Sequence, residues 1–163
     1  MTVVQKSRKT KEIYLAGPMS GCTHEDMHGW RERIKNHSDL HEHTLEKTVF
    51  SSVIAMPLFH YLDPSDRFYD EIAEMDLKVC REIVMGDKAD ISSADIVLAN
   101  LSQLGKYSCV GTLMEVIYAY GLGKYVVTIT NPDRPLSPWI VYHSTRIVHS
   151  EQAAVDVVRR SST

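Results

Sequence analysis

Apolar residues along this chain fall into two patterns: short continuous runs, and stretches in which they recur every three or four positions. The continuous runs predict buried strands at residues 13–16, 53–57, 96–101, 125–130 and 145–149. The first run, IYLA, ends at Gly17-Pro18, where a strand cannot continue. The run IVLANL at residues 96–101 is almost wholly apolar, which is typical of a parallel strand covered on both faces. We therefore predict that it is the central strand.

The periodic stretches predict helices between these strands. Met27, Trp30 and Ile34 share one helical face and predict a helix over residues 25–37. A second stripe is expected to break near Gly86 and to give way to a turn or short helix over residues 87–93. Its members are Tyr69, Ile72, Met75, Val79 and Ile83. Further helices are predicted at residues 111–120 and 151–160, the latter begun by Ser150.

Strands and helices alternate along the whole chain, which predicts an α/β fold. We expect a doubly wound, five-stranded, mainly parallel sheet of the flavodoxin-like or Rossmann-like kind, with helices on both faces. Residues 1–11 are expected to form a flexible tail and residues 12–163 a single domain. In such sheets ligands bind beyond the carboxyl ends of the strands, near the topological switch point. This selects the segments AGPMSG and YSCVGTLME, which follow the first and the central strand.

Composition narrows the classes of function. The chain has 163 residues, 44% hydrophobic and 24% charged, with a formal net charge of −3, so no basic surplus suggests binding to a nucleic-acid polymer. No apolar stretch approaches the roughly 18 residues that span a bilayer, and the N-terminus lacks the apolar run of a signal peptide. Three cysteines without CxxC spacing indicate neither a disulfide framework nor a zinc knuckle. We expect a cytoplasmic protein without membrane association.

Three side chains could carry chemistry, and each also has a structural explanation. Glu115 completes a T-x-x-E capping box with Thr112, although the first turn after the central strand should face the ligand crevice. Asp87 could be a surface carboxylate, and Tyr14 could simply pack in the core. Asp95 is expected to fix the turn before the central strand.

Three segments together resemble the nucleoside 2-deoxyribosyltransferase family, including its phage-type members. They are IYLAGPMSG, the D-x7-D-I-V-L pattern that begins at Asp87, and GTLMEVIYAYGLGKYVV. The similarity extends from Ile13 to about Ser150. It implies an enzyme of purine or pyrimidine salvage that cleaves the N-glycosidic bond of 2'-deoxynucleosides and passes the sugar to another nucleobase. It implies neither a cofactor nor a metal.

The same resemblance assigns roles to individual residues. Glu115 would be the nucleophile that attacks the anomeric carbon, Asp87 would handle proton transfer to the departing base, and Tyr14 would orient the Glu115 carboxylate. The other residues placed at the substrate are Gly17, Pro18, Ser108, Cys109, Gly111 and Ser137. Because Ser137 matches a position that reaches into a neighbouring subunit, a homo-oligomer with shared active sites is implied.

These roles agree with the chemistry of the bond. A glycosidic bond breaks through an oxocarbenium-like state, which a carboxylate beneath the anomeric carbon stabilises before it forms a covalent intermediate. A nucleobase leaves poorly unless it is protonated, so a second carboxyl is needed that holds its proton near neutral pH.

Other interpretations stay open at this stage. Many transferases carry an aspartate where this chain has Cys109, whereas related deoxynucleoside 5'-monophosphate N-glycosidases carry serine there and at the position of Ser137. The chain could therefore be a hydrolase that acts on a monophosphate. A non-catalytic nucleotide-binding sensor is an alternative of another class. The histidines at positions 24, 28, 37, 41 and 43 could suggest a metal, but solvated side chains are the favoured interpretation.

Overall fold

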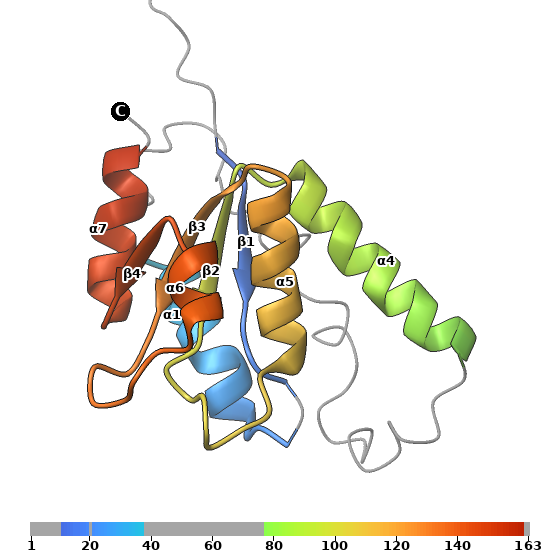
Figure 1. The fold of residues 1–163 in the computed structure, drawn as a ribbon, viewed down its shortest axis with the longest axis horizontal. Coiled ribbons are helices and arrows are strands. Elements are labelled where there is room, and N and C mark those ends of the chain that lie inside the picture. The colour runs from blue at the N-terminus through green and yellow to red at the C-terminus, as the bar shows by residue number, and fades with distance from the viewer. Residues whose placement is uncertain (1–10, 20, 38–76, 162–163) are drawn as a thin grey trace, which may run out of the picture.

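The computed structural model describes residues 11–19, 21–37 and 77–161, which form a parallel sheet flanked by helices (Figure 1). The strands are β1 (Ile13–Ala16), β2 (Ile96–Asn100), β3 (Tyr125–Ile129) and β4 (Arg146–Val148). They pair in the order β1-β2-β3-β4, with Ile13 opposite Ile96 and Ile96 opposite Tyr125. The predicted α/β class with a parallel sheet is confirmed.

The strand order fits the flavodoxin-like arrangement, in which the chain's second strand lies outside the first. The strand predicted at residues 53–57 would take that place, but it lies outside the described residues, as do residues 1–10 of the expected tail. Four of the five predicted strands are therefore observed, and the fifth stays a prediction.

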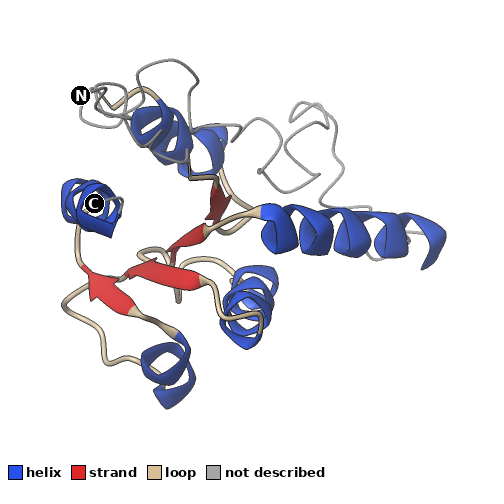
Figure 2. Ribbon diagram, turned by 90° about the horizontal axis from the view of Figure 1, so that it is seen from above, coloured by secondary structure: helices blue, strands red, loops and turns tan. Residues whose placement is uncertain are grey.

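Helices cover both faces of the sheet, as Figure 2 shows: α1 and α7 lie on one side of the strands, and α5 and α6 on the other. The helical segments are η1 (Glu25–Gly29), a π-helical turn, then α1 (Trp30–Lys35), α4 (Leu77–Ser93), α5 (Val110–Gly121), α6 (Pro138–His143) and α7 (Glu151–Ser161). None of those in the described ranges is long and apolar enough to cross a bilayer.

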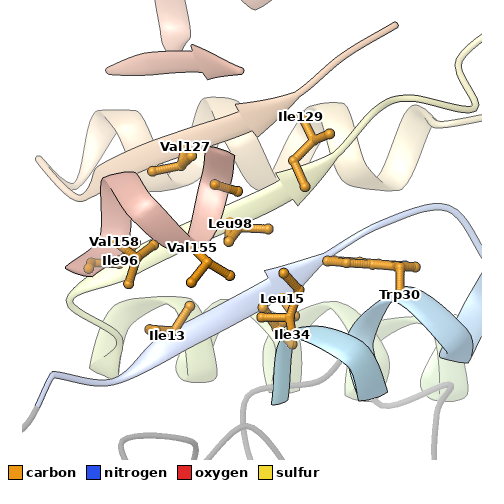
Figure 3. Packing of buried hydrophobic residues seen from close by; sticks show 11 residues of the cluster. Ile13, Leu15, Trp30, Ile34, Ile96, Leu98, Val127, Ile129, Val155 and Val158 are labelled. Atoms are coloured by element: carbon orange, nitrogen blue, oxygen red, sulfur yellow. The ribbon is translucent and has the colours of Figure 1, made fainter. Parts of the chain in front are cut away.

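The first face of the sheet packs against α1 and α7. Because side chains alternate along a strand, Ile13 and Leu15 of β1 point to this face together with residues of β2 and β3. The cluster, shown in Figure 3, contains Ile13, Leu15, Trp30, Ile34, Ile96, Leu98, Val127, Ile129, Ala154, Val155 and Val158. The predicted helical stripe through Trp30 and Ile34 therefore faces the core.

The second face packs against α4 and α5. Tyr14 and Ala16 of β1 point to this side, where they meet Ile91 of α4 and Val116 and Ala119 of α5. Both helices thus approach the strand that precedes the AGPMSG segment. This packing brings residues distant in sequence to the carboxyl edge of the sheet.

One helical prediction needs correction. The break expected near Gly86 is wrong, because α4 runs from Leu77 to Ser93 without interruption. A glycine inside a helix costs about 1 kcal/mol, and burial of Ile83 and Ile91 on either side holds the helix together. The residues from Tyr69 to Met75, which begin the predicted stripe, lie outside the described residues.

Helix α6 was not predicted. Its sequence, PWIVYH, buries only Ile140 and so shows no apolar helical periodicity. The helix is capped by Ser137, whose Oγ accepts a hydrogen bond from the Trp139 amide. The Trp139 and Tyr142 side chains are 64% and 68% exposed, so neither packs in the core.

Two polar predictions are confirmed. The Ser150 Oγ accepts a hydrogen bond of 3.1 Å from the Ala153 amide and so caps α7. The Asp95 Oδ2 accepts one of 3.0 Å from the Glu12 amide, which fixes the entry into β1 beside the turn before β2.

Candidate active site

The Tyr14 hydroxyl donates a hydrogen bond of 2.7 Å to Oε1 of Glu115. Tyr14 is fully buried in β1, on the face that α5 covers. Glu115 lies on α5 beside Val116 and one turn before Ala119, at the edge of the helix face that is buried against the sheet. Strand and helix thus hold phenol and carboxylate together across 101 positions of sequence.

Asp87 is the third member of this group. It lies on α4 one turn after Ile83 and one turn before Ile91, so it shares their buried face. Its side chain is half-buried, and its negative charge raises the pKa of both Tyr14 and Glu115. The structure therefore brings together the three residues to which catalytic roles were assigned.

Burial dominates the electrostatics of the pair. Burial is the largest cause that raises the pKa of Glu115, and the charge of Asp87 also raises it, while the Tyr14 hydrogen bond and the Arg31 charge lower it. The net result is a pKa of about 8. Burial, together with Glu115 and Asp87, raises the pKa of Tyr14 far above its usual range. The phenol therefore remains a neutral donor, and the carboxyl changes its charge near neutral pH.

The capping-box interpretation of Glu115 is wrong. The helix begins at Val110 with Cys109 at the N-cap position, so Thr112 lies inside the first turn. The Thr112 hydroxyl is buried and has no hydrogen-bond partner within the described chain. The Glu115 carboxylate is bonded to Tyr14 on a different element.

Gly17 and Pro18 follow β1 directly and are buried. A Cβ at Gly17 would lie 2.7 Å from Trp30 Cζ2, so only glycine lets the chain pass so close to the indole. The Gly17 carbonyl accepts a hydrogen bond of 3.2 Å from Arg31 Nη2.

The remaining predicted substrate residues lie at the starts of α5 and α6. Ser108 and Gly111 are exposed, whereas Cys109 is buried and packs with Leu101 and Ile140. Burial raises the pKa of the Cys109 thiol to about 11, so it is protonated and unsuited to act as a nucleophile. Ser137 is exposed and caps α6.

A polar contact joins the π-helical turn η1 to the loop after β2. The Asp26 carboxylate accepts hydrogen bonds from the Tyr107 hydroxyl and from Lys106 Nζ, the latter at 2.9 Å. The hydrogen bond from Tyr107 lowers the pKa of Asp26. The turn η1 and the loop at the carboxyl end of β2 are thereby held to each other.

A hollow of about 280 Å³ lies nearby, at the carboxyl ends of β2 and β3. Its lining is Leu101, Leu104, Gly105, Thr130, Asn131, Arg134, Pro135 and Leu136. Tyr14, Asp87 and Glu115 do not border it, so we locate the chemistry at the side-chain group rather than in this hollow.

The histidines considered as metal ligands show other contacts. The rings of His24 and His28 lie 4.6 Å apart, and His37 Nε2 is 2.9 Å from Gln152 Oε1. Positions 41 and 43 lie outside the described residues. Among residues 11–19, 21–37 and 77–161, no three His, Cys, Asp or Glu side chains gather in a group that could hold a metal ion.

The family model of nucleoside 2-deoxyribosyltransferases matches residues 13–157, which include Tyr14, Asp87 and Glu115. The chain belongs to the nucleoside 2-deoxyribosyltransferase family. No protein of curated function matches its sequence.

Solved structures share the fold of this deoxyribosyltransferase family member at low identity. A 2-deoxyribosyltransferase from Bacillus psychrosaccharolyticus superposes with a TM-score of 0.60 at 20% identity, covering 89% of this chain and 90% of the other. A conserved protein from Enterococcus faecalis V583 gives 0.62 at 18% identity, covering 94% and 99%. The CMP N-glycosidase of Clostridium botulinum gives 0.52 at 16% identity, covering 93% and 99%. The fold is thus found in both a transferase and a hydrolase.

One residue near the group escaped the sequence analysis. Arg31 is fully buried and its charge acts on both Tyr14 and Glu115 in this family member. The sequence does contain a signal for Arg31. It lies four positions after Met27 and three before Ile34, which places it on the apolar face of its helix. A charged residue on a buried face indicates a specific role.

Proposed function

We propose that this protein is a nucleoside 2'-deoxyribosyltransferase that works through a covalent deoxyribosyl-Glu115 intermediate. The 2.7 Å hydrogen bond from Tyr14 to Glu115, at the carboxyl edge of the sheet, carries this proposal. It restrains Oε1 of the carboxylate and so aims Oε2 at the anomeric carbon of a bound sugar. A nucleophile held by a positioned partner is the arrangement that covalent glycosyl transfer needs.

The first half of the reaction transfers the sugar to the protein. Glu115 Oε2 forms a bond to C1' while the bond from C1' to the base nitrogen breaks, and the electron pair of that bond stays on the base. Asp87 delivers a proton to the departing base. Two carboxyl groups beside C1' stabilise the positive charge that develops on the sugar.

The second half regenerates the carboxylate. A nitrogen of the incoming base attacks C1', the bond from C1' to Glu115 breaks, and its electron pair returns to the carboxylate. The incoming base loses a proton to Asp87, which is then ready to protonate the next leaving base. The partners are thus a deoxynucleoside and a free nucleobase.

A homo-oligomer with shared active sites is part of the proposal. Ser137 would contact the substrate of a neighbouring subunit. Its exposure at the start of α6, beside the exposed Trp139 and Tyr142, leaves it available for such a contact.

A second candidate is hydrolysis of a 2'-deoxynucleoside 5'-monophosphate, in which water replaces the incoming base. The burial of Cys109 favours it, because an apolar, protonated thiol cannot accept a hydrogen bond from a sugar hydroxyl as a carboxylate does. The exposed hydroxyl of Ser108 lies beside the first turn of α5, and helix N-termini favour anions such as phosphate.

Product analysis separates the candidates. The protein is incubated with each deoxynucleoside or its 5'-monophosphate, with and without a second free base, and products are resolved by chromatography. A new nucleoside shows transfer, whereas free base and sugar, with or without the added base, show hydrolysis. Ligand binding without any product would favour the non-catalytic sensor.

Glu115→Ala tests the covalent route. The variant should lose both exchange and hydrolysis by a factor of about 10⁴ or more, because the nucleophile is gone. Glu82→Ala, which removes an exposed glutamate of α4, is the matched control. Intact-mass spectrometry after acid quench should detect one added deoxyribosyl group on the wild type only. Undiminished turnover by Glu115→Ala would remove Glu115 from the mechanism.

A further inference from the structure

Arg31 is fully buried within α1, where its neighbours Trp30 and Ile34 belong to the core. Its guanidinium lies 4.7 Å from the centroid of the Trp30 ring. Burial of a guanidinium costs several kcal/mol unless its donors and its charge are compensated. Methionine or leucine would fit the apolar side of this helix without that cost, so the arginine needs an explanation.

The donors of Arg31 are bound to backbone carbonyls of three segments. Nε donates to the Leu15 carbonyl and Nη2 to the Gly17 carbonyl, both at 3.2 Å, and Nη1 donates to the Met27 carbonyl. Carbonyls two residues apart in an extended chain point to the same side, so the planar fork spans the end of β1 much as a neighbouring strand would. It links that end to the π-helical turn η1.

Tyr14 lies in the same strand, one residue before the Leu15 carbonyl that accepts the hydrogen bond from Nε. A displacement of Leu15 would move the phenol that orients Glu115. Placement errors of about 1 Å in a reacting group lower rates by roughly a hundredfold. The fork therefore constrains the geometry of the Tyr14–Glu115 hydrogen bond.

The charge of Arg31 also acts on Tyr14 and Glu115. It lowers the pKa of Glu115 and of Tyr14, in opposition to burial and to the negative charge of Asp87. Other titratable groups within its influence are Cys22 and His28. The buried cation thus offsets part of the charge of the two carboxylates.

We infer that Arg31 is a positioning residue of the active site, which fixes β1, the strand that carries Tyr14, and balances the charge of Glu115 and Asp87. The inference rests on the proposed role of Glu115 as nucleophile. A purely structural arginine would stabilise the fold without affecting the ionisation of Glu115.

Three variants separate these roles. Arg31→Met removes both the hydrogen-bonding fork and the charge, whereas Arg31→Lys keeps the charge but loses the fork. Arg33→Met is the matched control, because Arg33 on the same helix is exposed and pairs with Glu25 and Glu151. Two quantities are measured: the pH dependence of kcat/KM, and the titration of the Glu115 carboxyl by NMR of protein labelled with ¹³C-glutamate. The Glu115 signal is assigned by its loss in Glu115→Gln.

Arg31→Met should shift the Glu115 titration above about 8, while Arg31→Lys should titrate as the wild type with kcat lowered about tenfold to a hundredfold. If Arg31→Met does not fold, Arg31→Gln replaces it, since its amide keeps donors without charge. Identical titrations of Arg31→Met and Arg33→Met, or full kcat in Arg31→Lys, would overturn the inference. Absent turnover in the wild type, with the expected NMR shift, would overturn the proposed function but support the charge effect of Arg31.

Discussion

The hydrogen bond between Tyr14 and Glu115 couples geometry to ionisation, because the phenol both orients the carboxylate and lowers its pKa. Core packing was one interpretation of Tyr14 in the sequence, and the structure shows that its ring is buried while its hydroxyl is bonded to Glu115. Pattern alone could not show this, since an inward-facing tyrosine in a strand looks the same with or without a polar partner.

Tyr14→Phe should move the acid limb of kcat/KM to higher pH. Loss of the hydrogen bond removes an effect that lowers the pKa of Glu115, so the carboxyl should titrate above about 8, with activity at pH 7 reduced about tenfold. The pH–rate profile measures this. Tyr118→Phe on α5, whose hydroxyl lies 3.3 Å from Ser92 Oγ, is the control. An acid limb at the wild-type pH would contradict the expectation.

Glu115→Gln should stabilise the protein in alkaline solution. The pKa of Glu115 is raised from 4.5 to about 8 on folding, so its contribution to stability is present below pH 4.5 and is lost as pH rises through 8. Glutamine keeps an acceptor for Tyr14 without the charge. We expect the free energy of unfolding to rise by about 1–3 kcal/mol at pH 9, and by little at pH 5.

Urea denaturation at both pH values checks this prediction. A stability gain of equal size at pH 5 and pH 9 would show that ionisation of Glu115 is not its cause.

Arg31 shows why part of the site was missed in the sequence. The spacing of Met27, Trp30 and Ile34 predicts an apolar helical face but says nothing of Arg31, which lies on the same buried side. Spacing locates such a residue, but the backbone carbonyls that compensate its burial appear only when β1 and η1 are in place.

At the scale of elements, strands were predicted better than helices. β1, β2 and β3 agree with the continuous apolar runs to within one residue, because burial on both faces leaves a strong signal. α6 escaped prediction because it is short and mostly exposed, and the expected break in α4 failed because packing outweighs the weak propensity of Gly86.

Gly17→Ala should lower the free energy of unfolding by about 1–3 kcal/mol, because the added methyl group would overlap the Trp30 ring. Gly86→Ala is the matched control. Its Cβ would meet nothing within 4 Å inside α4, so this variant should gain about 0.5–1 kcal/mol. Urea unfolding measures both. A neutral Gly17→Ala would mean that the indole moves away at little cost.

For the whole molecule, the predicted α/β class and parallel sheet hold, while the number of chains in the active particle stays a prediction. The Trp139 and Tyr142 side chains are exposed, and the Tyr142 ring lies 5.5 Å from the ring of Tyr120 on α5. We expect these exposed rings to contact a second copy of the chain. Single-chain sequence patterns do not distinguish such a surface from a core.

The double variant Trp139→Ser, Tyr142→Ser should shift the protein toward a monomer and lower activity at least about tenfold, because Ser137 would no longer reach a neighbouring site. Sedimentation velocity and turnover measure the two effects. Val84→Ser, which replaces an exposed apolar residue of α4, should change neither. A fully active monomer would rule out shared sites.

The parallel pairing of β1 with β2 also governs how the chain acquires its reactive group. Ile13 pairs with Ile96, and Tyr14 bonds Glu115, and both partners are made much later in synthesis. β1 therefore leaves the ribosome long before its partner strand has been made. Until then a short apolar strand presents an unpaired edge, which makes early chains prone to association with one another. Closure of the long loop between β1 and β2 is slow. The pKa of Glu115 is raised only when that step has buried its carboxyl group. Only a chain in which β1 and α5 have come together therefore has the Tyr14–Glu115 hydrogen bond, and incompletely folded chains lack it.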